Sequence, residues 1–353
     1  MNRFGKLNRI SMRKIGILTG GGDCPGLNAV IRGVVQKCLL HDIQVYGFRK
    51  GWLGALTGDG DDLTLDMVED IHTLGGTILE SSRTNIMKVE DGPEKVRKVM
   101  EQLGLEGIIA VGGDDTLGVA NKLQKMGMNM IGVPKTIDND LSCTDYTFGF
   151  DTATNIAADA IDRLHTTARS HSRCFVVEVM GRHTGWIAIQ AGMAAGAHMI
   201  LIPEFPKSMD DVIAVIEDRK NRGKNHSIIC VAEGFELTGE KIESIETDDF
   251  GNVRLEKKEI GPRIAKLIEE RTGIITRSTV LGHLIRGGTP TAFDRVLGTK
   301  LGVKAAELVI NNAYGCMVAL QGNAIVPVDL EMAVTTQKRV DAEFYQHAGY
   351  FFG

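Results

Sequence analysis

The chain has 353 residues, a formal net charge of -5 and 43% hydrophobic residues, which is enough material for one large or two medium α/β domains. Lysine and arginine form no dense block and no apolar run could cross a bilayer, which argues against nucleic-acid and membrane partners. The six cysteines are scattered without a Cys-x-x-Cys pair, so we expect no disulfide or metal framework and a reducing, cytoplasmic location.

Short apolar runs alternate with segments of helical periodicity, which is typical of mostly parallel sheets covered by helices. The run at residues 15–18 predicts a buried strand, and the apolar spacing between Leu27 and Leu39 predicts the helix after it. Further strands are predicted at residues 107–111, 130–133, 174–179, 199–202 and 227–232.

Two segments do not fit this alternation. Residues 1–12 are basic but lack the apolar stretch of a secretory signal, so we interpret them as a disordered leader. The stretch from Glu236 to Glu259 is polar, highly charged and poorly periodic, which indicates a solvated hairpin or a surface insertion.

Nearly all of the predicted strands run directly into a glycine, a charged residue or a proline. Ligands of doubly wound sheets lie at the carboxyl ends of the strands, so the residues there are candidates for a site. The first strand runs into Gly20-Gly21-Gly22-Asp23-Cys24-Pro25-Gly26. Glycines let the backbone approach a phosphate closely, and the helix that follows offers free N–H groups to the anion. A tight glycine turn without a ligand is the alternative.

Two adjacent carboxylates, Asp114 and Asp115, follow a second glycine pair at the end of the strand at 107–111. Magnesium binds one or two carboxylates together with phosphate oxygens of a substrate, so we expect a Mg²⁺ site here. The alternative is that Asp115 or Thr116 only caps the helix that begins at this point.

The strand at 130–133 runs into Pro134-Lys135-Thr136-Ile137-Asp138-Asn139-Asp140. Asp138 and Asp140 lie two residues apart in this turn-rich segment, so one of them can accept a hydroxyl proton while the other positions its neighbours. Phosphoryl transfer to an alcohol needs such a base and otherwise depends on positioning and charge neutralisation. A turn rich in Asp and Asn is the alternative.

Several cationic side chains lie near the ends of apolar runs. Arginine binds phosphate oxygens in pairs, so several that converge would hold a dianion, although each alone is more often a surface charge. The candidates are Arg83, Arg173, Arg182, Arg277, His283 and Arg286.

These loops, in this order, resemble the phosphofructokinase family over nearly the whole chain, from Lys14 to about Ala313. The last motif departs from the family at Ile285, where the family often has Gln. The matching motifs are Gly21-Gly22-Asp23-x-Pro25-Gly26-x-Asn28, Thr136-Ile137-Asp138-Asn139-Asp140, Met180-Gly181-Arg182, and Gly282-His283-x-x-Arg286-Gly287-Gly288 followed by Asp294-Arg295.

The resemblance implies a role for each matching residue in transfer to fructose 6-phosphate. Asp138 would be the base that deprotonates the 1-hydroxyl, with Thr136 and Asp140 assisting. Arg182 would stabilise the transferring group, and Asp114 would bind Mg²⁺. The donor would be held by Gly21, Gly22, Arg83, Asp115 and Lys135. The sugar phosphate would be held by Thr136, Asp138, Arg173, Met180, Gly181, Arg182, Glu233, Arg277, His283 and Arg286.

The resemblance also implies two doubly wound α/β domains with the active site in the cleft between them. Residues 13–149, joined by 284–316, would form the donor domain. Residues 150–283 would form the sugar-phosphate domain, with 317–353 as a C-terminal hairpin and tail. In the family, Arg173 and Arg277 reach this pocket from a neighbouring subunit, so a homodimer or homotetramer is implied.

Two residues bear on the identity of the donor. Asp115 and Lys135 stand where ATP-using bacterial members of the family have glycine, and both resemble the pyrophosphate-dependent branch. A carboxylate would fill the space of the α-phosphate of a nucleotide and repel it by roughly 4 kcal/mol at about 4 Å and an effective dielectric near 20. That energy corresponds to about a thousandfold in affinity. The sequence therefore predicts a reversible pyrophosphate–fructose 6-phosphate phosphotransferase of glycolysis or gluconeogenesis.

Three other functions were weighed against this prediction. An ATP-dependent 6-phosphofructokinase keeps the fold and changes only the donor. A non-catalytic sugar-phosphate-binding subunit should have lost a reacting residue, yet Asp114, Asp138 and Arg182 are present. An NAD-binding protein would carry Gly-x-Gly-x-x-Gly after the first strand, which this chain lacks.

The sequence also predicts an enzyme without effector control. Allosteric bacterial members of the family bind charged effectors with a cationic cluster, of which this chain keeps Arg32. It has Gln36, Met67, His165 and Asn225 where those members carry Arg or Lys.

Overall fold

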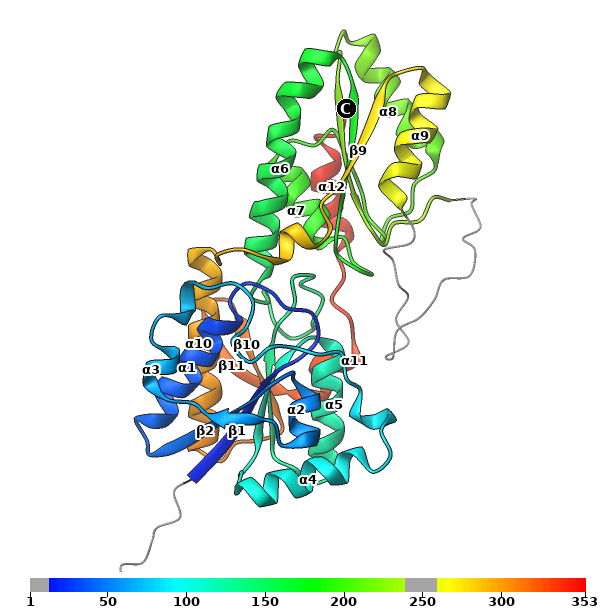
Figure 1. The fold of residues 1–353 in the computed structure, drawn as a ribbon. Coiled ribbons are helices and arrows are strands. Elements are labelled where there is room, and N and C mark those ends of the chain that lie inside the picture. Colours follow the sequence, from blue (N-terminus) through cyan, green and yellow to red (C-terminus); the bar gives the residue numbers. More distant parts are fainter. Residues whose placement is uncertain (1–12, 239–258) are drawn as a thin grey trace, which may run out of the picture.

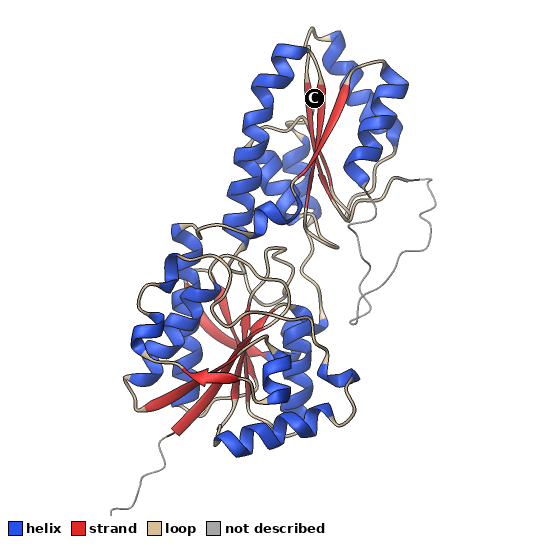
Figure 2. Ribbon diagram, in the orientation of Figure 1, coloured by secondary structure: helices blue, strands red, loops and turns tan. Residues whose placement is uncertain are grey.

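The computed structural model describes residues 13–238 and 259–353. The expected leader at 1–12 lies outside these residues, as does most of the charged stretch from Glu236 to Glu259. The described chain forms two β-sheets with helices on their faces, which Figures 1 and 2 show as two units, one above the other. The predicted α/β fold with mostly parallel sheets is confirmed.

The larger sheet has seven strands in the order β11-β10-β5-β4-β1-β2-β3. Thr19 pairs with Val111 and Gly112 pairs with Pro134, so the parallel strands β1, β4 and β5 end side by side. The three loops singled out from the sequence therefore begin at one edge of this sheet. The strands are β1 (Arg13–Thr19), β2 (Ile43–Phe48), β3 (Gly60–Asp62), β4 (Ile108–Gly112), β5 (Met130–Pro134), β10 (Cys316–Gln321) and β11 (Ala324–Asp329).

Helices cover both faces of this sheet, because successive residues of a strand point to opposite sides. Ile17 and Val111 lie in the same apolar cluster as helices α1 and α10, whereas Leu18 and Ala110 face α2, α4 and α5. Figure 1 shows α1 and α10 side by side. The helices of this unit are α1 (Leu27–Leu39), α2 (Trp52–Thr57), α3 (Leu65–Val68), α4 (Gly92–Leu103), α5 (Asp114–Lys125), α10 (Ala292–Ile310) and α11 (Leu330–Thr335).

The smaller sheet has four parallel strands in the order β7-β8-β6-β9, so β9 is an edge strand. The strands are β6 (Cys174–Val179), β7 (Met199–Leu201), β8 (Ser227–Ala232) and β9 (Thr276–Val280). The helices of this unit are α6 (Phe150–His171), α7 (Trp186–Ala194), α8 (Met209–Asn221), α9 (Ile260–Thr272) and α12 (Ala342–Gly349). A 3-10 helix, η4 (Gly282–Arg286), leads back to α10.

The C-terminal strand pair does not belong to the smaller unit, so the prediction that assigned residues 317–353 there is wrong for this pair. β10 pairs in parallel with β5 and in antiparallel with β11, which extends the larger sheet. Met317 and Val318 are fully buried, one in each of the two apolar clusters on opposite faces of the larger sheet. Only afterwards does the chain cross to the smaller unit, where Tyr345 of α12 stacks on Phe205 with ring centroids 4.5 Å apart.

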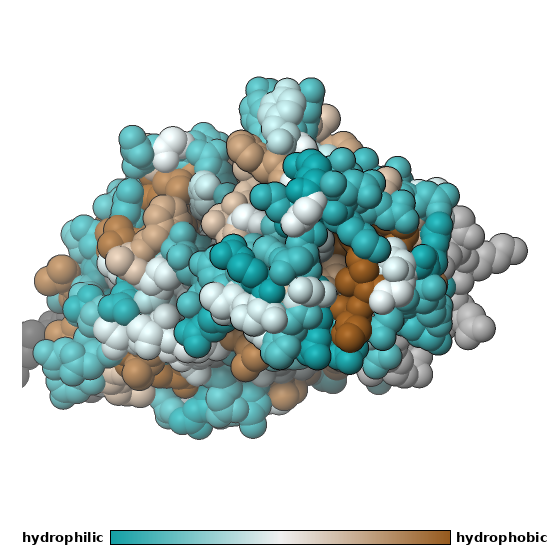
Figure 3. Space-filling view, turned by 90° about the horizontal axis from the view of Figure 1, so that it is seen from above, coloured by the Kyte–Doolittle hydropathy of each residue, from teal (hydrophilic) through white to brown (hydrophobic). Residues whose placement is uncertain are grey.

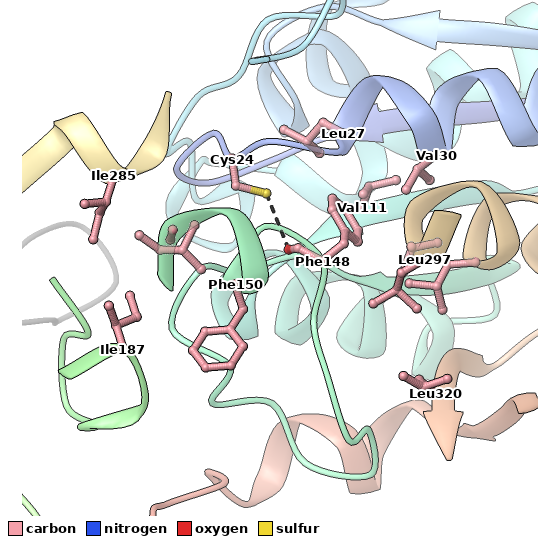
Figure 4. Packing of buried hydrophobic residues seen from close by; sticks show 14 of the residues in the cluster. Cys24, Leu27, Val30, Val111, Phe148, Phe150, Ile187, Ile285, Leu297 and Leu320 are labelled. Carbon is pink, nitrogen blue, oxygen red and sulfur yellow. Dashed lines mark hydrogen bonds between the residues drawn. The ribbon is translucent and has the colours of Figure 1, made fainter. Parts of the chain in front are cut away.

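One apolar cluster continues from the larger unit into the smaller one. Figure 4 shows the Cys24 thiol directed at the carbonyl oxygen of Phe148, with Sγ and oxygen 3.6 Å apart. Phe150, Ile187 and Ile285 belong to the same cluster. This packing joins the glycine-rich loop after β1 to the start of α6 and to η4, so it fixes these segments beside the candidate site.

Among the described residues, no helix is both long and apolar enough to cross a membrane. Figure 3 shows one end of the molecule, where hydrophilic side chains cover most of the surface and hydrophobic patches are separate from one another.

Candidate active site

The glycine-rich loop after β1 is held against strand β4 and the loop that contains Ser82. The Gly20 N–H donates to the Val111 carbonyl oxygen at 2.9 Å, and the Gly21 N–H donates to that of Ser82 at 3.1 Å. A Cβ on Gly22 would lie 1.7 Å from Nη2 of Arg286. The loop therefore leaves no room for a side chain at Gly22 and presents its backbone beside a cation, which suits an anionic ligand.

The two carboxylates of the second loop occupy the first turn of α5. The N-cap of this helix is Gly113, so the alternative that Asp115 or Thr116 is only an N-cap is wrong. Nη1 of Arg182 lies 3.7 Å from a carboxylate oxygen of Asp114, and its Nη2 lies 3.7 Å from one of Asp115. Carboxylate oxygens beside a helix N-terminus and an arginine can hold both a hard cation and the phosphates around it.

Lys135 is buried, although lysine is usually a surface residue. Its side chain is 4% exposed, and its Nζ donates to the Gly22 carbonyl oxygen at 2.5 Å. Burial lowers the pKa of Lys135, and the Arg286 cation contributes in the same direction. A buried cation that lies against the glycine-rich loop is suited to a compact, highly charged anion.

The loop after β5 turns sharply at Asn139, whose φ is +52°. The Asp138 N–H donates to Oγ1 of Thr136 at 3.0 Å, and the Asn139 side-chain oxygen accepts the N–H of Thr147 at 3.1 Å. Asp140 is buried, and its Oδ2 accepts a hydrogen bond from Gln337 at 3.1 Å. Asp138 is the more exposed carboxylate of the two, so it is the one that a substrate can reach.

Both carboxylates of this loop have raised pKa values. Burial raises the pKa of Asp138 to about 6, and the neighbouring Glu233 carboxylate adds to the rise. The cations Arg182 and Arg286 oppose it. Burial raises the pKa of Asp140 to about 7, with repulsion from Asp138 as the next cause. The pair therefore holds a proton at mildly acidic pH and can accept one near neutrality.

The smaller unit contributes residues that follow β6 and β8. Met180 and Gly181 follow β6 directly, and the N–H of Arg182 donates to a carboxylate oxygen of Glu233 at 3.0 Å. The backbone of Arg182 is left-handed, with φ of +53°, which turns this residue toward α5 of the other unit. The two units thus meet where Arg182 lies beside Asp114.

Arg286 is a second cation that crosses between the units. It is 8% exposed, and its guanidinium donates through two nitrogens to the Asp23 carbonyl oxygen at 3.1 Å each. His283 lies on the exposed side of the same 3-10 helix. Arg83 is also exposed, and the preceding Ser81 and Ser82 are hydrogen bonded to Gly21.

Arg173 and Arg277 lie at the opposite end of the smaller sheet. Arg173 precedes β6 and Arg277 pairs with Phe175 near its start, whereas Arg182 follows the end of β6. A strand of this length spans about 20 Å, so these two arginines cannot join Arg182 within one chain. In the structure Arg277 bonds Glu269 at 3.3 Å, and Nε of Arg173 is buried without a hydrogen-bond partner.

Three polar contacts to the loop after β5 were not predicted from the sequence. The Thr184 hydroxyl donates to the Asp138 carbonyl oxygen at 3.3 Å, and Gln337 and Lys338 bind Asp140 and Asn139. Thr184 stands close behind Met180-Gly181-Arg182 and could have been found as an extension of that motif. Gln337 and Lys338 belong to no motif and to no periodic pattern, so the sequence alone does not indicate that they contact this loop.

A histidine cluster lies at the opposite, amino-terminal ends of β7 and β8. Ring nitrogens of His165, His198 and His226 lie within 4.8 Å of one another, a spacing that could suit a metal ion. However, Nδ1 of His198 accepts the Ile228 N–H at 2.8 Å, so a neutral ring carries its proton on Nε2. Burial lowers the pKa of His198 to about 3, and the Arg219 cation adds to this effect. The cluster therefore fits a three-histidine cation site poorly.

Comparisons with known proteins agree with the predicted family. The family model described as phosphofructokinase matches residues 14–309. The chain is 54% identical over 343 residues to a protein of Amycolatopsis mediterranei (strain S699) named pyrophosphate–fructose 6-phosphate 1-phosphotransferase, covering 96% of this chain and 100% of the relative. It is 48% identical over 338 residues to ATP-dependent 6-phosphofructokinase 3 of Streptomyces coelicolor (strain ATCC BAA-471 / A3(2) / M145), covering 95% and 98%.

Among solved structures, phosphofructokinase from Saccharomyces cerevisiae matches with a TM-score of 0.81 and 30% identity. The match covers 91% of this chain and 45% of the longer yeast chain. The family match spans most of the chain and includes the loops after β1, β4, β5 and β6. This chain therefore belongs to the phosphofructokinase family.

Proposed function

We propose that this protein transfers a phosphoryl group from inorganic pyrophosphate to the 1-hydroxyl of fructose 6-phosphate, giving fructose 1,6-bisphosphate and phosphate. Two observations carry the choice of donor: Asp115 lies in the first turn of α5, and the ammonium of the buried Lys135 donates to the Gly22 carbonyl oxygen of the glycine-rich loop. The Amycolatopsis relative with the corresponding name, at 54% identity over its whole length, supports the same donor and acceptor.

Asp138 acts as the general base in this proposal. It takes the proton of the 1-hydroxyl, and the oxygen then forms a bond to the nearer phosphorus of pyrophosphate while the bridging P–O bond breaks. The leaving group is inorganic phosphate, so atoms and charge balance without another reactant. The raised pKa of Asp138 suits this role, because a base that operates near neutral pH works best with a pKa close to that pH.

Cationic groups offset the charge that collects on the transferring group. Arg182 lies beside Asp114 and Asp115 at the junction of the two units, and Lys135 and the backbone of the glycine-rich loop face the donor. Asp114, whose side chain is half exposed in the first turn of α5, would hold Mg²⁺. A bound Mg²⁺ supplies positive charge to the phosphate oxygens of the donor.

The same residues disfavour ATP. A nucleotide carries an α-phosphate and a base beyond the two phosphates that pyrophosphate offers, so it needs open space next to the donor loops. The Asp115 carboxylate would repel that α-phosphate, and Val119 is buried in the helix behind it. ATP is the alternative donor to be tested, because one relative at 48% identity is named as an ATP-dependent enzyme.

The sugar phosphate would lie across the two units and across two subunits. Glu233 and Arg286 are placed near Asp138 in one chain, whereas Arg173 and Arg277 lie at the far end of the smaller sheet. We therefore infer that these two arginines serve the site of a neighbouring copy in a homo-oligomer. Val280 of the edge strand β9 and Leu284 of η4 are 51% and 72% exposed, which supports an apolar contact at this edge.

The proposal is tested by following phosphorus-31 signals of purified protein with fructose 6-phosphate, pyrophosphate and Mg²⁺. We expect pyrophosphate to be consumed and fructose 1,6-bisphosphate and phosphate to appear in equal amounts, with the reverse reaction from added products. Product formation with ATP but not with pyrophosphate would establish the alternative donor. Binding of fructose 6-phosphate without turnover by either donor would establish a non-catalytic subunit.

A further inference from the structure

A C-terminal segment, residues 336–340, lies along the loop that carries Asp138. The Lys338 N–H donates to the Asp140 carbonyl oxygen at 2.8 Å, and Leu141 forms an antiparallel bridge with Gln337. The side-chain amide of Gln337 donates to the Asp140 carboxylate at 3.1 Å. This segment therefore contacts both the backbone and the carboxylate of Asp140.

The Lys338 ammonium is directed into the same loop. Its three donors bind the side-chain oxygen of Asn139 at 3.0 Å and the carbonyl oxygens of Thr144 and Asp145 at 3.0 and 2.7 Å. All of its hydrogen-bonding capacity is thus used on residues 139–145. Asn139 is the residue whose left-handed backbone makes the turn between Asp138 and Asp140, so Lys338 stabilises that turn.

The smaller unit holds the other side of residues 336–340. The indole N–H of Trp186 donates to the Lys338 carbonyl oxygen at 3.0 Å, and the ammonium lies 5.3 Å from the centre of the indole ring. A carboxylate oxygen of Glu204 accepts the Val340 N–H at 3.2 Å. The segment is therefore fixed to the catalytic loop on one side and to the smaller unit on the other.

We propose that Gln337 and Lys338 are positioning residues for phosphoryl transfer, which hold the Asp138–Asp140 turn in the conformation and ionisation state that the reaction needs. This inference rests on the proposed role of Asp138 as the base. Neither residue touches the reacting atoms; both act through Asn139 and Asp140.

The charges around the turn give the proposal a specific consequence. Asp140 faces the carboxylates of Asp138 and Asp114, and the Gln337 amide and Lys338 ammonium oppose that repulsion. The negative charges of Glu233 and Asp114 also act on Asp138, and the cations Arg182 and Arg286 oppose them. Removing a donor or a cation beside such a pair disfavours its fully ionised state, so the pair retains a proton to higher pH, whichever carboxylate binds it.

The test compares Gln337→Leu and Lys338→Met with two matched controls in the full chain. Gln321→Leu removes a glutamine bond to the Cys143 carbonyl oxygen, also 3.1 Å long. Lys125→Met removes an exposed lysine that pairs with Glu331 in α11. In Gln337→Leu we expect the acid limb of kcat to move up by about one pH unit, which lowers kcat about twofold at neutral pH and about tenfold on the acid side of the limb. Both controls should follow the wild-type profile.

Hydrogen exchange of the peptide that covers residues 136–147 provides a readout independent of activity. It should be faster in Lys338→Met than in Lys125→Met at a temperature where both variants are folded. If Lys338→Met does not fold, the proposal is tested with Gln337→Leu by the same two measurements, the pH profile of kcat and the hydrogen exchange of residues 136–147. Unchanged pH profiles and unchanged exchange in the folded variants would overturn the proposal while leaving the proposed reaction intact. A wild-type protein without transferase activity would instead refute the reaction, and the exchange data would still test whether residues 336–340 hold the turn.

Discussion

The ammonium of Lys135 donates a hydrogen bond to the Gly22 carbonyl oxygen at 2.5 Å, so a cation from the loop after β5 is fixed against the loop after β1. The two loops meet because β1, β4 and β5 end side by side in the larger sheet. Burial lowers the pKa of this lysine, which means that its charged form is held at a cost in solvation. A polyanion bound beside the Lys135 ammonium would offset this solvation cost. The position of Lys135 against the glycine-rich loop therefore bears on which donor binds.

Asp115 and Lys135 are the two residues proposed to select the donor. Asp115→Gly together with Lys135→Gly should open space for the α-phosphate of ATP. It also removes the Asp115 carboxylate, which would repel an α-phosphate about 4 Å away by roughly 4 kcal/mol. We expect kcat/KM for ATP to rise and kcat/KM for pyrophosphate to fall in the double variant. Steady-state kinetics with each donor measures both changes.

Asp210→Gly is a matched control, because it removes an acidic residue from the first turn of α8 in the smaller unit. This control should keep the wild-type preference between donors. A double variant with the wild-type preference would mean that Asp115 and Lys135 do not select the donor.

The second prediction concerns the base. Asp138→Ala should lower kcat by about two to four orders of magnitude, because general-base catalysis contributes on that scale. The melting temperature should change little, since the Asp138 side chain is not fully buried. Asp66→Ala, an exposed carboxylate at the start of α3, serves as the control and should keep full activity. An Asp138→Ala protein with near wild-type turnover would refute the assigned role.

The third prediction is the pH dependence of kcat/KM, which reports on the free enzyme. A base with a raised pKa is ionised and active above that pKa and is lost as the pH falls through it. We therefore expect kcat/KM to fall tenfold per pH unit below about pH 6, where Asp138 takes up a proton. Glu233→Gln removes the neighbouring negative charge and should move this limb to lower pH. If the acid limb of the kcat/KM profile does not move in Glu233→Gln, the limb reports the titration of another group.

The fourth prediction rests on the short distance between the Gly22 backbone and the guanidinium of Arg286. A Cβ at position 22 would lie 1.7 Å from Nη2 of Arg286, so Gly22→Ala must displace that guanidinium from the Asp23 carbonyl oxygen. Because a charge-assisted contact to phosphate contributes about 1.5–3 kcal/mol, we expect KM for fructose 6-phosphate to rise tenfold or more.

Gly118→Ala is the control for this substitution. It lies in α5 where an added Cβ meets nothing within 4 Å, so it should leave KM unchanged and raise the melting temperature slightly. An unchanged KM in Gly22→Ala would contradict a role of Arg286 in binding the sugar phosphate.

The sequence was sufficient to predict the loops after β1, β4 and β5 because the relevant information is local. Each loop directly follows an apolar run, and the runs at 15–18, 107–111 and 130–133 correspond to β1, β4 and β5. Parallel strands necessarily bring their carboxyl ends to one edge. The convergence of Gly22, Asp114 and Lys135 could therefore be predicted before their contacts were seen.

The location of the C-terminal strands and the contacts of Lys338 could not be predicted in this way. Whether β10 extends one sheet or the other depends on which edge strand it pairs with, and the local pattern of Met317 to Leu320 is the same in both cases. Lys338 binds Asn139 across 199 residues of sequence, without periodicity or motif at either end. Such contacts are set by the path of the chain between the two units.

We propose that pyrophosphate is the phosphoryl donor and fructose 6-phosphate the acceptor. The most direct measurement is kcat/KM of the purified wild-type protein for pyrophosphate and for ATP, at saturating fructose 6-phosphate and Mg²⁺. We predict a ratio of at least about a hundred in favour of pyrophosphate, on the scale that repulsion by Asp115 allows. Equal values for the two donors, or a higher value for ATP, would rule out pyrophosphate as the preferred donor.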